Sequence, residues 1–322
     1  MRVATVDIGT VSSRLLLATL EDGRIAAARK RTQITDLGEG VDATGRLADA
    51  AIGRVLYTCA AFRDDITAFN PRATVLTLTS AARDAENGDE LLDGLVRLGF
   101  SPQIIPGEVE GRLTFFGVAR DFAGERIAVA DSGGGSTELV TGCYEPGRPL
   151  VVDALSSLNV GCRRMTERFD LRGPVDEAAL EPAGRWAREL LDRYWGGLDE
   201  RPGRLVAVGG TVTTLVAMEQ GMVSYDSSRV HLSTLTLEQV AGAVGRLSEC
   251  TVEEIACLPG VQPKRAPVLL GGALIVRELM RAGGYEELTV SENSLMAGMA
   301  ATIYEAVSRS ETTIGWKPAI TW

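Results

Sequence analysis

The sequence predicts an α/β protein made of two related halves, and three observations support this fold class. The chain has 322 residues, about twice the roughly 150 residues expected of one domain. Short apolar and β-branched runs alternate with longer stretches of helical periodicity. Residues 7–15 (DIGTVSSRL) can also be laid over residues 131–139 (DSGGGSTEL). We therefore expect two domains, residues 1–124 and 125–322, with the last helix able to pack back on the first domain.

The individual elements follow from the alternation. Strands are expected at 3–6 and 15–20, on either side of a glycine turn. From residue 47, apolar residues three and four apart define one face of a helix, which Asn70 and Pro71 end. Further strands are expected at 75–79, 103–105, 127–130, 138–141, 205–208 and 288–290, and further helices at 90–98, from 108, at 177–194 and at 236–247.

The composition excludes several classes of function. Apolar residues make up 45% and charged residues 24% of the chain, as in ordinary globular proteins. The 33 basic and 43 acidic residues give a net charge of −10, which argues against nucleic-acid or anionic-membrane partners. A phosphate site in such a chain must use backbone amides, a metal ion or locally placed arginines.

The inventory of side chains narrows the chemistry further. With His231 as its one histidine, the chain excludes mechanisms that need two imidazoles. The five cysteines show neither zinc nor redox spacing and predict reduced thiols in the cytoplasm. The first strand meets a charge too early for a signal peptide, and the longest apolar stretch, 266–276, is too short for a membrane span.

Each copy of the repeated motif, D-x-G-x-x-S-x-x-L, follows one apolar strand and precedes another. Glycine lets backbone amides approach a phosphate, the next Ser or Thr adds a hydroxyl, and the strand-end aspartate can hold hydrated Mg²⁺. A β-hairpin that uses Asp and Gly for its own geometry explains a single copy equally well. Two matched copies, and the glycine run 133–135 in the second, favour a phosphate site.

A second internal echo pairs residues 206–211 (VAVGGT) with 268–273 (VLLGGA) and supports the duplication. The amides of residues 209–211 lie between a strand and a helix and could bind an anion, although a structural turn is as good an explanation. Arg83 follows a strand end, where α/β sheets place ligand groups; a surface arginine is the alternative.

Other conspicuous residues receive simpler interpretations. Glu108 and Glu110 open a helix, where the dipole stabilises carboxylates whatever their function. The lone His231 is expected to be structural. The basic run 29–31 is expected to be a solvated strand end.

Taken together, these motifs resemble the exopolyphosphatase and guanosine pentaphosphatase (Ppx/GppA) family, within the superfamily of actin, sugar kinases and heat-shock chaperones. The resemblance runs nearly end to end. It implies a two-domain, actin-like (ribonuclease-H-like) fold with the active site in the interdomain cleft. The matching runs are 7–15, 37–40 (LGEG), 79–87 (TSAARDAEN), 105–113 (IPGEVEGRL), 131–139, 157–161 (SLNVG) and 208–211 (VGGT).

The resemblance also implies roles for single residues. Glu110 matches the family's catalytic glutamate, which orients or deprotonates the attacking water. Asp131 and Glu138 match positions associated with the divalent metal, Mg²⁺ or Mn²⁺, and Asp7 is expected to join them. The positions implied to contact phosphate are Gly9, Thr10, Ser12, Ser13, Arg83, Gly133, Gly134, Gly135, Ser136, Gly209, Gly210 and Thr211.

The implied reaction is metal-dependent release of terminal orthophosphate from inorganic polyphosphate, by a cytoplasmic homodimer. A guanosine pentaphosphate 5′-phosphohydrolase, a small-molecule kinase of the same superfamily and a non-catalytic polyphosphate- or nucleotide-binding regulator are the alternatives. A haloacid-dehalogenase-type phosphatase is rejected, because that chemistry needs an aspartate where Gly9 stands.

The chain departs from the family at three places. Val11 replaces an asparagine in the first turn, and Pro267 replaces the aspartate of an Arg-Ala-Asp run. The chain also ends at Trp322, without the additional C-terminal domains of longer members, which predicts a preference for short polyphosphate.

Overall fold

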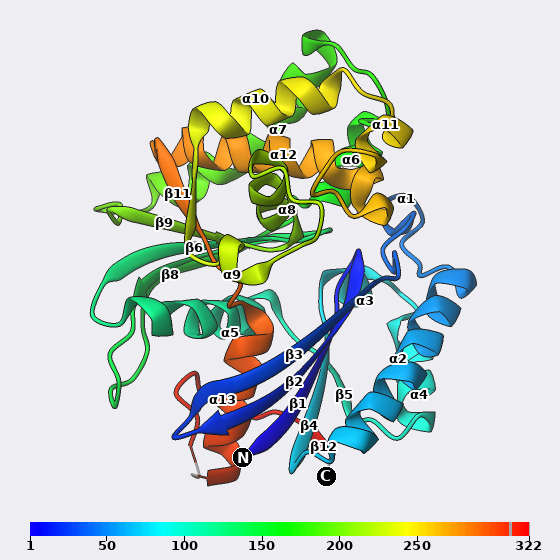
Figure 1. The fold of residues 1–322 in the computed structure, drawn as a ribbon, viewed down its shortest axis with the longest axis vertical. Helices are drawn as coiled ribbons and strands as arrows, with labels where there is room; N and C mark the ends of the chain where they lie inside the picture. Colours follow the sequence, from blue (N-terminus) through cyan, green and yellow to red (C-terminus); the bar gives the residue numbers. More distant parts are fainter. Residues whose placement is uncertain (309–310, 322) are drawn as a thin grey trace. The chain divides into compact units, whose positions relative to one another are not determined.

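The computed structural model describes residues 1–308 and 311–321 and divides into two compact units (Figure 1). Unit 1 consists of Met1–Ala123, Tyr144–Leu150 and Leu295–Trp322, and unit 2 of Gly124–Cys143 and Val151–Ser294. The first change of unit lies between Ala123 and Gly124, and the last helix, which the sequence allowed to pack back on the first domain, lies in unit 1. Unit 2 is inserted in the sequence of unit 1 in two pieces, on either side of Tyr144–Leu150.

Unit 1 contains one mixed sheet, in the order β12-β4-β1-β2-β3 with β5 paired to β4. The central strand β1 runs parallel to β4 and antiparallel to β2. The strands are β1 (Arg2–Ile8), β2 (Ser12–Glu21), β3 (Arg24–Ile34), β4 (Ala73–Leu78), β5 (Pro102–Ile104) and β12 (Ile320–Thr321). The helices are α1 (Val41–Thr44), α2 (Asp49–Phe69), α3 (Ser80–Asp84), α4 (Gly88–Arg97), α5 (Gly107–Ala119) and α13 (Leu295–Ser308), with a 3₁₀ turn η1 (Arg120–Phe122).

Alternation along the strands of unit 1 builds two cores, one on each face of the sheet. Val6 and its even-numbered neighbours of β1 pack with α2 and α4, whereas Val3 packs on the opposite face with α5 and α13. Helix α2 ends as expected, with Asn70 in the left-handed conformation (φ 50°) before Pro71. Gly298 of α13 lies against the backbone of Leu113 in α5, where any side chain would overlap that backbone.

Unit 2 has a second mixed sheet, in the order β10-β11-β9-β6-β7-β8. The strands are β6 (Arg126–Ser132), β7 (Thr137–Cys143), β8 (Val151–Leu158), β9 (Arg204–Val208), β10 (Ser233–Thr236) and β11 (Glu287–Val290). The helices are α6 (Cys162–Phe169), α7 (Glu177–Gly196), α8 (Gly210–Glu219), α9 (Ser227–Val230), α10 (Leu237–Ser248), α11 (Val252–Ala256) and α12 (Ala266–Gly283), with a 3₁₀ turn η2 (Pro263–Arg265).

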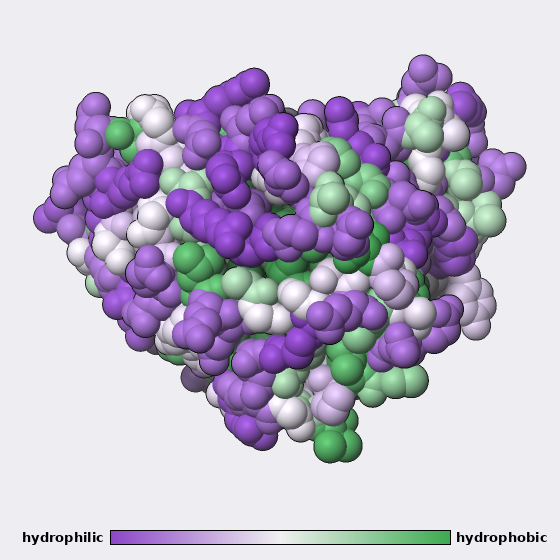
Figure 2. Space-filling view, turned by 90° about the horizontal axis from the view of Figure 1, so that it is seen from above, coloured by the Kyte–Doolittle hydropathy of each residue, from purple (hydrophilic) through white to green (hydrophobic). Residues whose placement is uncertain are grey.

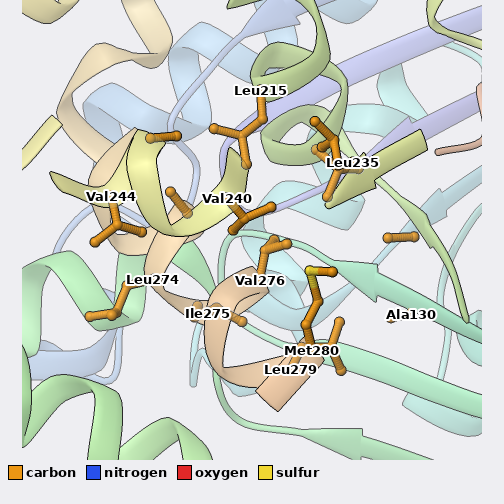
Figure 3. Close-up of a cluster of buried hydrophobic side chains, with 14 of the residues drawn as sticks. Ala130, Leu215, Leu235, Val240, Val244, Leu274, Ile275, Val276, Leu279 and Met280 are labelled. Carbon is orange, nitrogen blue, oxygen red and sulfur yellow. The ribbon is translucent and has the colours of Figure 1, made fainter. Parts of the chain in front are cut away.

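The core of unit 2 joins its sheet to α8, α10 and α12. Leu215, Val240 and Ile275 come from these three helices and belong to one buried cluster, which Figure 3 draws. Hydrophilic residues predominate on the face of the molecule in Figure 2, with apolar residues between them. Within the part of the chain that the structure describes, no helix combines the length and the apolar run that crossing a bilayer requires.

The two sheets repeat one topology. The order β4-β1-β2-β3 in unit 1 corresponds to β9-β6-β7-β8 in unit 2, and in both the first pair is parallel and the next two pairs are antiparallel. The predicted duplication of a strand, a glycine turn and a strand is therefore confirmed.

The second echo is wrong as a structural equivalence. Residues 206–211 run from β9 into α8, but residues 268–273 lie wholly inside α12. The helix keeps Gly271 and Gly272 because their missing side chains let it approach α6 at Thr166 and α8 at Thr211. The basic run 29–31 is exposed, as expected, but it lies inside β3 rather than at a strand end.

Candidate active site

The repeated motif forms the same closed turn in both units. The backbone N–H of Gly9 donates to the carbonyl oxygen of Ser12, and that of Gly133 donates to the carbonyl oxygen of Ser136, each at 2.9 Å. A side chain at either glycine would press on that same carbonyl. Each turn leaves the carboxyl end of the central strand, at the edge where sheets with parallel strands bind ligands.

In unit 2, helix α6 holds the turn by its carbonyl groups. The carbonyl oxygens of residues 133–135 accept hydrogen bonds from two backbone N–H groups of α6 and from Nε of Arg164, each at 2.9 Å. In a trans peptide the N–H points opposite to the preceding carbonyl. The amides of residues 134–136 therefore point away from α6, and three consecutive amides with one orientation form a nest for an anion.

In unit 1, the segment that follows β3 holds the first turn by its carbonyl groups, as α6 does in unit 2. The backbone N–H of Gly38 donates to the Thr10 carbonyl at 2.9 Å, and two further N–H groups, from Thr35 and Asp36, donate to the Val11 carbonyl at 3.0 Å. Val11 is only 5% exposed, and its carbonyl keeps this role although the asparagine of the family is missing. Ser13 is fully buried, and its hydroxyl lies 3.0 Å from the Thr35 hydroxyl, inside this contact.

Two glycines make these contacts possible. A side chain on Gly38 would overlap Thr10, and one on Gly161, which precedes α6, would overlap the backbone of Gly134. Both glycines belong to runs that the sequence comparison singled out, 37–40 and 157–161. Their role is to let a second backbone segment approach a turn whose amides face the other way.

Arg83 and Glu110 form a half-buried ion pair beside the turn of unit 1. Arg83, on α3, donates through Nη1 to the Ile105 carbonyl at 2.9 Å and to Glu110 Oε2 at 3.2 Å. Glu110 opens α5 and is 8% exposed. Glu108, two residues earlier, is instead exposed and pairs with Arg112 one helical turn on. The structure thus separates two carboxylates that their place at a helix start left equivalent and of which the family resemblance singled out Glu110.

The strand-end aspartates have different opposite neighbours in the two units. Asp7 of β1 stands opposite Arg14 of β2, whose Nε and Nη2 lie 2.8 and 2.5 Å from Asp7 Oδ2. Asp131 of β6 stands opposite Glu138 of β7, and Glu138 Oε1 accepts a 2.7 Å hydrogen bond from Ser157. Asp131 and Glu138 are 6% and 2% exposed.

These carboxylates fit a divalent cation that keeps part of its water shell. No group of three or more His, Cys, Asp or Glu side chains in residues 1–308 and 311–321 could hold a metal by itself. Mg²⁺ does not require one, because it is commonly held by one or two carboxylates together with substrate phosphates and water. Asp7 Oδ1 is buried and has no hydrogen-bond partner among the described residues, so it has an acceptor position open to a hydrated ion.

The second glycine turn of unit 2 opens α8. Gly209 adopts φ 99° and ψ 167°, a conformation essentially restricted to glycine, and a side chain there would lie 3.2 Å from Asp131 Oδ1. The guanidinium of Arg265 occupies the space beside Gly210 that a side chain would need. A cation and the N-terminal amides of α8 therefore meet at one place, next to the Asp131 carboxylate.

The structure groups the predicted residues by unit. Unit 1 holds Asp7, Gly9, Thr10, Ser12, Ser13, Arg83 and Glu110, and unit 2 holds Asp131, Gly133, Gly134, Gly135, Ser136, Glu138, Gly209, Gly210 and Thr211. Sequence reasoning assigned no role to Arg164 or to Arg265. The glycine at position 210 could have indicated Arg265, because the missing side chain makes room for the guanidinium. Nothing in the sequence pattern indicated a role for Arg164.

The cysteine beside the turn of unit 2, Cys162, is not an activated nucleophile. Burial raises the pKa of the Cys162 thiol, against the opposing charges of Arg265 and Arg163, so this side chain stays a neutral thiol. His231 accepts a hydrogen bond at Nδ1 from the backbone N–H of Glu292, at 3.2 Å, in agreement with the structural role expected for it.

Comparison with known proteins gives one consistent family. Residues 16–306 match the Ppx/GppA phosphatase family. The chain is 35% identical over 319 residues to Exopolyphosphatase 2 of Mycobacterium tuberculosis, covering 94% of this chain and 98% of that protein.

Two solved structures match at 30% identity. The first, an exopolyphosphatase-like protein, has a TM-score of 0.85, and the match covers 93% of this chain and 96% of that protein. The second, the Aquifex aeolicus member of the Ppx/GppA family, has a TM-score of 0.77, and the match covers 96% of this chain and 99% of that protein. The expected two-sheet, actin-like α/β fold is therefore confirmed.

Proposed function

We propose that this chain, which belongs to the Ppx/GppA phosphatase family, is an exopolyphosphatase. Such an enzyme releases terminal orthophosphate from inorganic polyphosphate. Membership over nearly the full length makes it a phosphoanhydride hydrolase. Inorganic polyphosphate as the substrate is the proposal, supported by the name of the Mycobacterium tuberculosis relative and by the geometry of the two turns.

Hydrolysis of a phosphoanhydride needs an aligned water and positive charge around the transferred group. We assign the water to Glu110, which accepts its proton as the oxygen attacks phosphorus. The bond from phosphorus to the bridging oxygen breaks, and the shortened chain leaves with that oxygen. Arg83 fixes the Glu110 carboxylate through its 3.2 Å contact and keeps further N–H donors for phosphate oxygens.

Backbone amides can meet part of the charge on the phosphates. The amides of residues 134–136 and the N-terminus of α8 can donate to phosphate oxygens without any reorganisation of the turns. Asp131 and Glu138 of unit 2 are proposed to hold Mg²⁺, and Asp7 of unit 1, through its open Oδ1, is proposed as a further acceptor for a hydrated cation. When bound, Mg²⁺ would neutralise part of the charge on the transferred phosphoryl group. Mn²⁺ suits the same oxygen ligands.

The single observation that carries the proposal is the ion pair of Arg83 and Glu110, which lies in the unit whose strand β1 leads into the turn at Gly9. A half-buried carboxylate held by a guanidinium suits proton acceptance, and the amides of the turn suit phosphate. A regulator that only binds polyphosphate would have no use for that carboxylate.

The decisive experiment measures orthophosphate release in the presence of Mg²⁺ from short polyphosphate, long polyphosphate and guanosine pentaphosphate, with ATP as control. We expect release from polyphosphate, lost when EDTA removes the metal. Turnover of guanosine pentaphosphate alone would reassign the substrate, and binding of polyphosphate without release would support the regulator.

Three finer expectations accompany this proposal. The preference for short chains is tested by the two polyphosphate lengths of the same assay. The homodimer is tested by light scattering of the purified chain, and the cytoplasmic location by fractionation of cells that express it.

A further inference from the structure

Three arginines of unit 2 surround one fully buried carboxylate, that of Glu278 on α12. Arg188 of α7 donates to Glu278 Oε2 through Nε at 2.8 Å and also through Nη2. Arg277 Nε and Arg281 Nη1 donate to Oε1 at 2.8 and 3.1 Å. Glu278 itself is 0% exposed. The two helices lie side by side at this point, in the upper part of Figure 1.

The cluster carries more positive charge than its own carboxylate can offset. Within residues 1–308 and 311–321, Glu278 is the only acidic side chain that pairs with any of the three arginines, so three positive charges meet one negative charge. Arg281 lies in the last turn of α12, where the helix dipole favours a cation. Arg188 and Arg277 have no such support, and Arg277 is only 8% exposed. The two buried charges, those of Arg277 and Glu278, offset each other, so the excess positive charge lies on Arg188 and Arg281, where it attracts an anionic partner.

The geometry leaves donors for such a partner. Glu278 accepts four N–H groups, whereas each guanidinium carries five. The side chains of Arg188 and Arg281 are 46% and 42% exposed, so their remaining N–H groups reach solvent. Gly184 of α7 lies beside the cluster, and a side chain there would meet Arg277 Nη2 at 3.6 Å, an ordinary contact. Guanidinium groups bind oxyanions with two parallel hydrogen bonds.

We propose that Arg188, Arg277 and Arg281, held together by Glu278, form a second anion site, which binds a tetrahedral oxyanion of the orthophosphate class. An anion of about two negative charges offsets the excess of the cluster. The site is separate from the glycine turns. Glu278 stands 12 residues along α12 from Ala266, about 18 Å at 1.5 Å per residue.

Helix α12 connects this site to the turn that opens α8. Its first residue, Ala266, follows Arg265, which lies beside Gly210, and Gly272 contacts Thr211. A single helix, α12, therefore links an anion bound around Glu278 to the turn at the start of α8. Orthophosphate is the product of the proposed reaction, so a role in product sensing rests on the proposed function, whereas binding of the anion does not.

The test measures the melting temperature, Tm, against increasing orthophosphate, with NaCl added to keep the ionic strength constant. We expect saturating phosphate to raise the Tm of the parent by about 2–4 °C. Arg188→Gln lowers the excess charge by one and is expected to lose most of that gain. Glu278→Gln raises the excess positive charge by one. Whatever its Tm without phosphate, this variant is expected to reach its full rise in Tm at a lower phosphate concentration than the parent. Arg185→Gln, an exposed arginine of α7 paired with Glu181, should behave like the parent.

The opposite responses of Arg188→Gln and Glu278→Gln separate a ligand site from a structural network, because loss of a structural contact lowers the starting Tm in both. Equal gains in all four proteins would show only the general effect of phosphate on folded proteins and would overturn the proposal. If Arg188→Gln does not fold, Arg281→Gln, which removes a single contact to Glu278, replaces it with the same expected loss. None of these measurements uses polyphosphate, so the Tm shifts test the anion site even if the chain proves not to be an exopolyphosphatase.

Discussion

Asp131 and Glu138 stand directly opposite each other on β6 and β7, at the register positions that Asp7 and Arg14 occupy on β1 and β2. The duplicated hairpin thus carries a carboxylate and a guanidinium in one copy and two carboxylates in the other. Like charges directly opposite on neighbouring strands repel, so the second copy is suited to binding a cation. This difference between two otherwise equivalent turns underlies the assignment of Mg²⁺ to unit 2.

Replacement of Asp131 by Asn is expected to weaken metal use rather than the fold. The amide keeps the shape of the side chain but removes one of two charges, so the Mg²⁺ concentration for half-maximal phosphate release should rise about 10–100-fold. Titration of activity with Mg²⁺ measures this. Asp153→Asn, an exposed carboxylate on β8 of the same unit, is the control. An unchanged Mg²⁺ requirement would remove Asp131 from the metal site.

Glu110→Gln should leave folding intact and remove most turnover. The amide cannot accept a proton from water, and loss of a general base lowers rates about 10²–10⁴-fold. The initial rate of phosphate release from polyphosphate tests this, with Glu108→Gln as the matched control on the same helix. Comparable losses in both variants would mean that the first turn of α5 acts only through the fold.

Arg83→Met is expected to lower kcat about 10²-fold, because it frees the Glu110 carboxylate and removes a donor to phosphate. Arg112→Met breaks the exposed Arg112–Glu108 pair on α5 and should change the rate less than twofold. Steady-state kinetics on one polyphosphate length compare the two variants. Arg83→Lys should recover little, since an ammonium cannot reproduce the planar fork.

Gly161→Ala should destabilise the protein by about 2 kcal/mol or more, because the added methyl overlaps the Gly134 backbone. The same change should weaken polyphosphate binding, since it displaces the amides of residues 134–136. Gly242→Ala, in the interior of α10 with open space around it, should instead be stabilising by about 0.5–1 kcal/mol. Urea unfolding of both variants measures the difference. Equal stability of the two proteins would contradict the close contact between α6 and the turn.

Alkaline pH should unfold unit 2 through two buried tyrosines. Burial raises the pKa of Tyr194 and of Tyr285 from 10.0 to about 12. The unfolded chain then loses these protons near pH 10 while the folded chain keeps them. The contribution to stability is complete below pH 10 and disappears as the pH rises towards 12, by about 2–3 kcal/mol per tyrosine at most.

Urea unfolding at pH 9, 10.5 and 11.5 measures that loss. Tyr285→Phe removes the titrating group together with one hydrogen bond, to the Pro202 carbonyl, so it should lower stability at pH 9 but flatten the decline above pH 10. A decline as steep as that of the parent would assign the alkaline effect to other groups.

The sequence predicted the fold well where its signals are local. The helix that ends at Asn70 and the two D-x-G turns follow from apolar spacing and from glycine. The sequence indicated only a strand end at 29–31 and missed the extent of β3, because nearly all its residues are exposed and show no alternation. Helix α12 was misread at Gly271 and Gly272, because glycine pairs normally interrupt elements. Here they serve contacts with α6 and α8 that no local pattern encodes.

The sequence could name candidate site residues but not the contacts between them. The motifs led to Glu110 and Arg83 singly, but their pairing depends on how α3 and α5 follow β4 and β5. The segments that hold the two turns, after β3 and at α6, also come from a distance in the sequence. The charge excess around Glu278 was invisible, because Arg188 lies 90 residues away from it.

The return of α13 and β12 to the first unit has a consequence for synthesis of the protein. A ribosome that has released only the first 294 residues has supplied the whole of unit 2 but left the sheet of unit 1 without β12 and its core without α13. The amino-terminal part, although made first, must then wait for α13 and β12, while the inserted part can complete itself earlier. Loss of the segment that carries α13 and β12 would accordingly harm residues 1–123 more than unit 2.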